Sequence, residues 1–250
     1  MTSRGYRAAT SRTPSARSLR DDLLVPEVAR LHAENYGVYG RRKMHALMRR
    51  QGWDIGRDQT ERLMRLAGVR GVKKSKRVFT TKSDPAAALP KDLVQRRFTA
   101  DGRIVGWNVA ATLKAEILHM QALDMAARDA GGDLSGLTHH SDHGSNYMAT
   151  VYTDRILELG AVPSTGTVGD SYDNAMAEAV NNLDKTELIR QRGPWRTVEQ
   201  VELATLEYVW WWNHQRLHGE LDMRTPIEVE TAHHADLESA QQSPAGQRNR

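Results

Sequence analysis

Apolar residues recur at helical spacing through the first third of the chain. Pro26 suits the first position of a helix, and Val28 continues that helix on its apolar face. Two further helices are predicted over residues 39–51 and 57–67, separated by a glycine-containing turn. Two short helices around a tight turn favour a helix-turn-helix module over residues 23–72, with an ordinary helical bundle as the alternative.

Strand and helix patterns alternate in the second part of the chain. We expect strands at residues 103–109, 134–141 and 161–165, and helices at residues 112–130, 151–159 and 172–189. This alternation predicts an α/β domain with a partly parallel sheet. Capping patterns at Thr197 with Gln200 and at Thr225 with Glu228 predict two more helices.

Three segments lack such periodicity. Residues 1–22 form a basic arm that we expect to be flexible, although its composition would also suit an organelle transit peptide. Residues 73–98 combine a basic patch with a Pro/Ala stretch, which is typical of an interdomain linker. Residues 234–250 are polar, and we expect them to be a disordered tail.

The composition excludes several classes of protein. The chain has 250 residues and no cysteine, which excludes a disulfide scaffold, a thiolate zinc site and a cysteine nucleophile. No segment approaches the roughly 18 consecutive apolar residues that a membrane span needs, so we expect no membrane association. With 39% hydrophobic and 26% charged residues, the chain is typical of a globular protein.

The charge is divided unevenly along the chain. Residues 1–82 hold 20 Lys/Arg and 7 Asp/Glu, whereas residues 83–250 hold 15 and 24. A basic module of this kind favours nucleic acid as its partner, although a solvated basic surface is an alternative. The expected DNA contacts face outward from the third helix or follow it directly: Arg57, Thr60, Arg62, Arg65, Lys73, Lys74, Lys76 and Arg77.

Three consecutive tryptophans stand near the end of the chain, at positions 210 to 212. Tyr208 and Trp212 share a helical face with Val201, so we expect both to be buried. Trp211 falls on a different face in this phase and could contact DNA or a partner.

Two carboxylates are candidates for chemistry. Asp142 follows a predicted strand in a glycine-containing loop, where the ligands of α/β proteins gather, although a helix cap or a turn would also explain it. Glu178 lies on a polar helix face with Asn174 and Asn181. An alternative is a mononuclear metal site at His139, His140, Asp142 and His143. It is disfavoured because adjacent strand residues point to opposite faces.

The sequence segments around these carboxylates resemble those of a known family. The segments HHSDHGSNY, GAVPSTGTVGDSYDNAMAEAVNNLDKTELI and WWWNHQRLHGELDMRTP are similar to the integrase core of bacterial insertion-sequence transposases of the second-reading-frame type. Upstream, ENYGVYGRRKMHALMRRQGWDIGRDQTERLMRLAGVRGV resembles the family's helix-turn-helix region, and KRVFTT resembles its basic junction. The resemblance extends from about Pro14 to His233.

The resemblance implies a fold, a chemistry and partners. It implies a ribonuclease H-like core over residues 99–233, in which Asp, Asp and Glu hold two Mg²⁺ or Mn²⁺ ions for DNA cleavage and strand transfer. Asp142 matches the second Asp, and Glu178 matches the Glu. The implied partners are the insertion sequence's terminal repeats, target DNA, and either further copies of this chain or the first-reading-frame product. The implied location is the bacterial cytoplasm, in association with the nucleoid.

One part of the family pattern is missing. The family's first Asp lies in a strand of the type WxxDxTY, but here RRFTA at residues 96–100 runs directly into DGRIVGW at residues 101–107. A few dozen residues are therefore expected to be deleted, and Asp101 beside the junction is not a replacement. We predict an incomplete core and an inactive transposase. The alternative is a repressor-like remnant that binds DNA without catalysis.

Overall fold

The computed structural model describes residues 13–72, 102–111, 115–141, 150–165 and 175–242. The chain divides into two compact units, residues 1–73 and residues 74–250, and each is described by itself. In the described parts of both units, no helix is long and apolar enough to cross a membrane.

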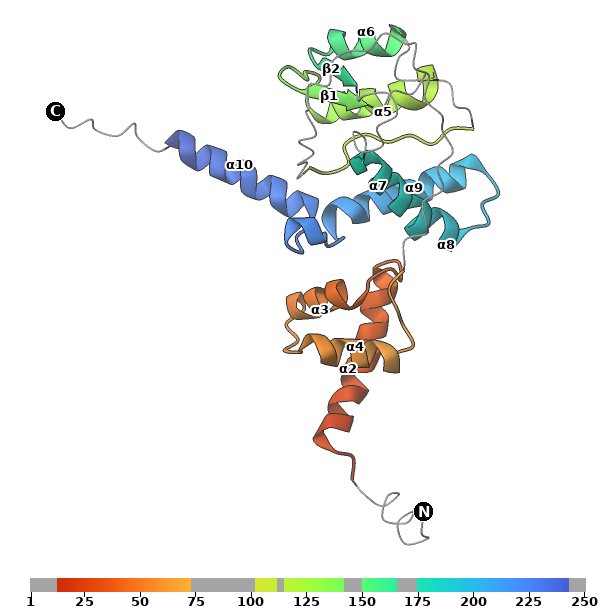
Figure 1. Ribbon diagram of the computed structural model, residues 1–250, viewed down its shortest axis with the longest axis vertical. Helices are drawn as coiled ribbons and strands as arrows, with labels where there is room; N and C mark the ends of the chain where they lie inside the picture. The colour runs from red at the N-terminus through yellow and green to blue at the C-terminus, as the bar shows by residue number, and fades with distance from the viewer. Residues whose placement is uncertain (1–12, 73–101, 112–114, 142–149, 166–174, 243–250) are drawn as a thin grey trace, which may run out of the picture. The chain divides into compact units, whose positions relative to one another are not determined.

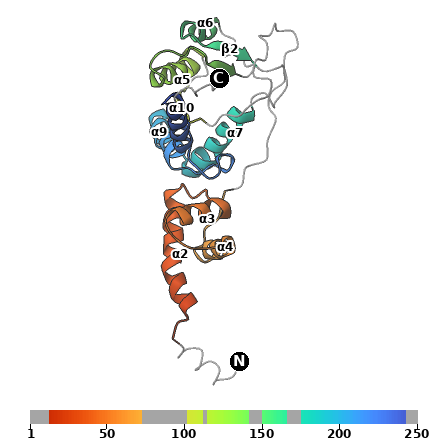
Figure 2. The ribbon, with the colours of Figure 1, turned by 90° about the vertical axis from the view of Figure 1, so that its left-hand side faces the viewer.

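Three helices form the first unit: α2 (Ala16–Glu34), α3 (Arg41–Arg50) and α4 (Arg57–Leu66). Helix α2 is the longest, and its first turns extend beyond α3 and α4 in both views (Figure 1, Figure 2). The three helices share a core of fully or almost fully buried side chains: Leu24, Val28, Leu31, Met44, Met48, Leu63 and Met64. The predicted helical module is therefore present.

The start of α2 differs from the prediction. The helix begins at Ala16 because the Ser15 hydroxyl accepts the backbone N–H of Ser18 at 3.2 Å, which caps the first turn. Residues 16–22 of the expected flexible arm are thus helical, and residues 1–12 lie outside the described residues. Pro26 lies inside α2 rather than at its start.

The turn between α3 and α4 follows the glycine pattern. Gly52 adopts a φ of +86°, a conformation that side-chain-bearing residues rarely adopt, and Gly68 ends α4 with a φ of +70°. Between the two helices, Ile55 is 4% exposed and packs into the core of the unit. These features confirm the helix-turn-helix arrangement.

The second unit begins with a small α/β layer. Its elements are α5 (Ala115–Asp129), β1 (Thr138–Ser141), α6 (Thr150–Glu158) and β2 (Val162–Thr165). The two strands pair in parallel, as predicted, with Thr138 opposite Val162 (Figure 1). Side chains from the helices and their connections form one core: Met120, Leu123, Ala127, Leu134, Tyr152, Ile156, Leu159 and Ala161.

The strand predicted at residues 103–109 is wrong, because this segment has no regular secondary structure. The Asn213 side chain accepts the Ile104 backbone N–H and donates to its carbonyl oxygen, both at 2.8 Å. A side chain thus bonds to backbone groups that a neighbouring strand would otherwise pair. Within the described residues, the sheet consists of β1 and β2.

Helices complete the second unit. Helix α7 (Ala175–Asp184) continues into a π-helical turn (Lys185–Ile189) and the short α8 (Arg190–Arg192), followed by α9 (Val198–His214) and α10 (Pro226–Gln242). Both predicted caps are present. The Thr197 hydroxyl accepts the N–H of Gln200, and Thr225 and Glu228 bond reciprocally.

The prediction of a disordered tail from residue 234 is wrong for residues 234–242, because these residues belong to helix α10. A capping box stabilises the first turn of helix α10, and no glycine or proline interrupts the helix between its first turn and Gln242. The helix therefore continues through this segment. Residues 231–240 are exposed, and the helix extends away from α9 (Figure 1). Residues 243–250 lie outside the described part.

The tryptophan prediction is half right. Trp212 and Tyr208 are buried, but Trp211 is also buried, at 2% exposure, whereas Trp210 is 53% exposed. Positions 208, 211 and 212 lie three and four residues apart, so they share one helix face. The Tyr208 ring centroid lies 5.5 Å from that of Trp211 and 5.9 Å from that of Trp212. Trp211 is therefore a core residue and not a contact for DNA.

We predict that truncation of Trp211 destabilises the fold far more than truncation of Trp210. Trp211→Ala should lower the free energy of unfolding by about 3–5 kcal/mol, because it empties a buried site. Trp210→Ala should cost under about 1 kcal/mol, because most of that side chain is already in water. Denaturant titration of the two variants measures the difference, and equal losses would contradict the assignment.

Candidate functional site

The two candidate carboxylates lie at the edges of what the structure describes. Asp142 follows directly after Ser141, the last residue of β1, and is itself outside the described residues. The backbone of Glu178 is part of helix α7. The approach of these two carboxylates to one another therefore stays a prediction.

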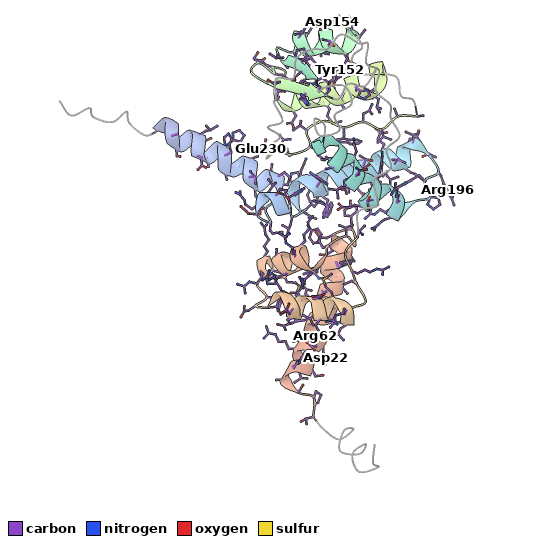
Figure 3. The ribbon with its side chains drawn as sticks, viewed as in Figure 1. Asp22, Arg62, Tyr152, Asp154, Arg196 and Glu230 are labelled. Carbon is purple, nitrogen blue, oxygen red and sulfur yellow. The ribbon has the colours of Figure 1, made fainter. Side chains whose placement is uncertain are left out.

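The histidines next to Asp142 have other partners. His139 shares a hydrogen bond of 3.0 Å with the Tyr152 hydroxyl of α6, whereas His140 Nδ1 lies 3.0 Å from the Ser164 hydroxyl of β2. Figure 3 shows Tyr152 within the α/β layer. Burial lowers the pKa of His139 and favours its neutral form. The described residues contain no cluster of three metal-binding side chains, and Asp142 and His143 of the mononuclear alternative lie outside them.

A buried ion pair joins the helix that carries Glu178 to α9. Arg216 and Glu187, 4% and 6% exposed, form two hydrogen bonds of 3.0 and 2.7 Å. The Tyr208 hydroxyl donates a third bond, of 3.0 Å, to the same carboxylate. Glu187 stands in the π-helical turn that continues α7, at a place where such turns often mark functional sites.

Aromatic rings complete the surroundings of Arg216. Its guanidinium carbon lies 4.4 Å from the ring centroid of Trp212 and 5.8 Å from that of Trp211. His218 Nδ1 lies 3.3 Å from the same guanidinium. Burial and the nearby Glu187 carboxylate raise the pKa of the Tyr208 hydroxyl, which keeps this group protonated as a donor.

This network was not predicted from the sequence. Its signal is a charged residue, Arg216, directly after the tryptophan run, where burial demands a partner of opposite charge. Nothing in the sequence reveals that Glu187, 29 positions earlier, is that partner. The network engages its charged groups internally, so its role is to hold α7 and α9 in place rather than to react.

In the first unit, the structure separates the predicted DNA contacts into two groups. Arg57 and Arg65 are exposed on α4. Thr60 is fully buried, and its hydroxyl donates to the Gly56 carbonyl oxygen at 2.9 Å, so its outward orientation was predicted wrongly. The reason is that Thr60 shares the inward face of α4 with Leu63 and Met64.

Arg62 links two helices of the first unit. Both terminal nitrogens bond to the Asp21 carboxylate of α2 at 2.6 Å, and the Arg62 side chain is 25% exposed. Figure 3 labels Arg62 in the three-helix unit. The hydrogen bond from Arg62 lowers the pKa of the Asp21 carboxyl. Arg62 therefore has a structural partner already. Lys73, Lys74, Lys76 and Arg77 lie outside the described residues.

Two family models match the chain. Residues 19–77 match the HTH-like domain, and residues 159–226 match the integrase core domain. The first match covers all but the first turn of the three-helix unit. The second runs from the end of α6 through the buried ion pair to the start of α10.

Several curated proteins are similar over most of the chain. A Mycobacterium tuberculosis (strain ATCC 25177 / H37Ra) protein assigned to insertion sequence element IS986/IS6110 is 41% identical over 259 residues, covering 90% of this chain and 93% of its own. The transposase for insertion sequence element IS629 of Shigella sonnei is 38% identical, covering 89% of this chain and 84% of its own.

Each of these two alignments is longer than the part of this chain that it covers. In the M. tuberculosis comparison, 90% of 250 residues is about 225, so about 34 of the 259 aligned positions have no counterpart in this chain. In the S. sonnei comparison, 89% is about 223, which leaves about 32 of 255 positions without a counterpart. Both relatives thus carry a few dozen residues that this chain lacks.

We predict that Arg216→Met lowers the free energy of unfolding by about 3–5 kcal/mol, because it leaves the Glu187 carboxylate buried without its partner. A double variant, Arg216→Met with Glu187→Leu, should recover part of this loss, because it removes both charges together. Denaturant titration of the single and double variants measures this recovery. A double variant less stable than Arg216→Met alone would contradict it.

Proposed function

The chain belongs to the insertion-sequence transposases, and we propose that it is a member whose DNA-binding module is retained while its catalytic core lacks the first metal-binding carboxylate. Its proposed activity is binding to the DNA ends of an insertion sequence, without strand cleavage by this chain alone. The observation that carries the proposal is the junction at residues 96–107, where two family segments meet without the strand that belongs between them.

Two further observations support a missing block. About 30 positions of each relative have no counterpart here, which is the length expected for the missing strand and its neighbours. Directly after the junction, the backbone of Ile104 bonds to the side chain of Asn213 instead of to a strand. An integrase core without its central strand would have to satisfy its backbone groups in this way.

The donor set of this chain does not fit a pair of divalent ions. The family uses divalent metal, and its arrangement needs Asp, Asp and Glu, of which this chain matches the second Asp and the Glu. Asp142 and Glu178 are hard oxygen donors of the kind that Mg²⁺ and Mn²⁺ prefer. Without the carboxylate shared between the ions, however, two ions cannot be held about 3.5–4 Å apart for an in-line displacement.

We predict that the purified chain does not cleave DNA carrying the element's terminal repeats, with either Mg²⁺ or Mn²⁺. A chimera that receives the missing block from a complete relative should recover metal-dependent cleavage, because it regains the third carboxylate. Strand cleavage measured on end-labelled DNA tests both. Glu178→Gln is the control in each background, and cleavage by the unaltered chain that this substitution abolishes would contradict the proposal.

The DNA-binding part of the proposal depends on α4. Arg57 and Arg65 stand eight positions apart, a little over two helical turns, so they lie on one exposed face. The basic residues from Lys73 to Arg77 follow soon after this helix. Two arginines of α3 are engaged by acids at 2.6 Å, Arg41 by Glu61 and Arg49 by Asp54. Arg57 and Arg65 of α4 are therefore stronger candidates for phosphate contacts than Arg41 and Arg49 of α3.

We predict that DNA binding weakens steeply with salt and that Arg57→Ala and Arg65→Ala each reduce the salt slope by about 1, because each releases about one counterion fewer. Titrations of labelled DNA at several salt concentrations measure the slope. Arg128→Ala, an exposed arginine on α5, is the matched control and should leave the slope unchanged. Equal slopes for all three variants would rule out α4 as the DNA-binding surface.

A repressor-like remnant is the second candidate function, and it is favoured by the integrity of the three-helix unit beside an incomplete core. It shares the DNA-binding prediction and differs only if the chain also represses transcription of its element. For the transposase-family function, the proposed partners are the insertion sequence's terminal repeats, target DNA, and either further copies of this chain or the first-reading-frame product, and the proposed location is the nucleoid.

A further inference from the structure

Helix α2 is joined to α4 by a polar contact at the end of their shared core. On the inward face of α2, the buried Leu24, Val28 and Leu31 recur at intervals of four and three. Asp21 lies three positions before Leu24 and continues this face, at a place where another apolar side chain would lengthen the core. Its carboxylate instead accepts two hydrogen bonds of 2.6 Å from the Arg62 guanidinium of α4.

The geometry of this pair suits a link between helices. Both oxygens of Asp21 and both terminal nitrogens of Arg62 take part, a bidentate arrangement that fixes direction as well as distance. The two side chains are 17% and 25% exposed, whereas both partners of the Arg41–Glu61 pair are about half exposed. Water and salt therefore screen the Asp21–Arg62 pair less than they screen that surface pair.

A second bond from α2 reaches the turn before α4. Arg20, next to Asp21, donates a hydrogen bond of 2.6 Å to the backbone carbonyl oxygen of Asp54. Beside the Asp21–Arg62 pair lies a hollow of about 420 Å³, which is lined by polar or charged side chains from both helices: Arg17, Asp58, Gln59 and Arg62. Next to this hollow, the position of α4 on α2 therefore depends on the bonds between Arg62 and Asp21.

The same contacts distinguish Arg62 from Arg57 and Arg65, which are exposed on α4. A phosphate that approached Arg62 would have to displace a carboxylate that already bonds to both terminal nitrogens. It would also leave the Asp21 carboxylate, which is 17% exposed, without this partner, and the lost bonds would offset the new contact. Arg62 is therefore poorly suited to bind a phosphate.

We propose that Arg62 is a positioning residue, which acts on DNA binding by holding α4 in place on Asp21 of α2 and not by a phosphate contact of its own. This rests on the proposed function, in which α4 contacts DNA. Phosphate contacts set the register of a protein on the duplex, so the helix that makes them must be held in a fixed orientation. Asp21, an acid in the DNA-binding module, thereby supports the binding of a polyanion.

Replacement of Asp21 separates positioning from charge. On charge alone, Asp21→Asn should strengthen DNA binding, because it removes a negative charge from the module that meets the phosphates. A positioning role predicts the opposite sign. In the full chain, Asp21→Asn should raise the dissociation constant for labelled DNA carrying the element's terminal repeats about tenfold, roughly the loss of one good contact.

Glu34→Gln is the matched control, because it makes the same change of an acid to an amide on the same helix. Glu34 is about half exposed and pairs at 2.6 Å with Arg30 of α2 itself, so it links no second helix through this bond. Its replacement should leave the dissociation constant unchanged or slightly lower.

A charge exchange tests the pair from the side of Arg62. Arg62→Asp and Asp21→Arg should each weaken binding, the second although it adds positive charge, because each sets like charges against one another. The double variant restores the pair in reverse and should recover most of the loss, although α4 has lost a positive charge. If Arg62 bound a phosphate itself, the double variant would bind as weakly as Arg62→Asp.

Circular dichroism of each chain at the assay temperature accompanies the titrations. If a single variant is unfolded, the charge-exchanged chain, which retains the pair, decides. Stronger or unchanged binding by folded Asp21→Asn, or a charge-exchanged chain that binds no better than Arg62→Asp, would overturn the proposal. If the unaltered chain shows no salt-dependent DNA binding, the proposed function itself fails, and the positioning role fails with it.

Discussion

The C-terminal half of the second unit depends on one buried ion pair. Two charged groups removed from water are tolerable only when they are paired and fully hydrogen-bonded, and Arg216 and Glu187 meet this condition through two mutual bonds and the Tyr208 hydroxyl. Since Arg216 stands two residues after the end of α9 and Glu187 in the turn after α7, the pair fixes these helices against each other. The tryptophans of α9 then pack around the guanidinium, and the outward side of α9 is set by the same constraint.

The contacts of the same unit are those expected if, as we propose, a central element of the fold has been lost. The parallel pair β1–β2 is retained with its covering helices, and Asn213 supplies bonds to Ile104 that a strand would normally provide. Packing around the strands survives because it depends on side chains close in sequence, such as Tyr152 and Ile156 of α6. Catalysis is more fragile than packing, because a two-metal site needs every one of its carboxylates.

Sequence patterns predicted the elements well wherever local chemistry decides them. The caps at Thr197 and Thr225 and the glycine turn of the first unit depend on residues within four positions of each other, and the structure confirms them. The strand at residues 103–109 failed because a strand requires a neighbour, which no local pattern guarantees. Trp211 was misplaced because the inward face was drawn too narrowly through Val201, Tyr208 and Trp212. Trp211 follows Tyr208 by three positions and lies on the same buried face.

The charge division of the chain follows from the different demands on its two units. A catalytic carboxylate cluster must approach a phosphodiester of the same sign, and bound divalent ions are what reconcile the two. When one carboxylate is missing, ion binding weakens, and the remaining acids of the second unit repel DNA instead of attracting it. Affinity for DNA then depends on the first unit, where residues 13–72 hold 12 Lys/Arg against 7 Asp/Glu.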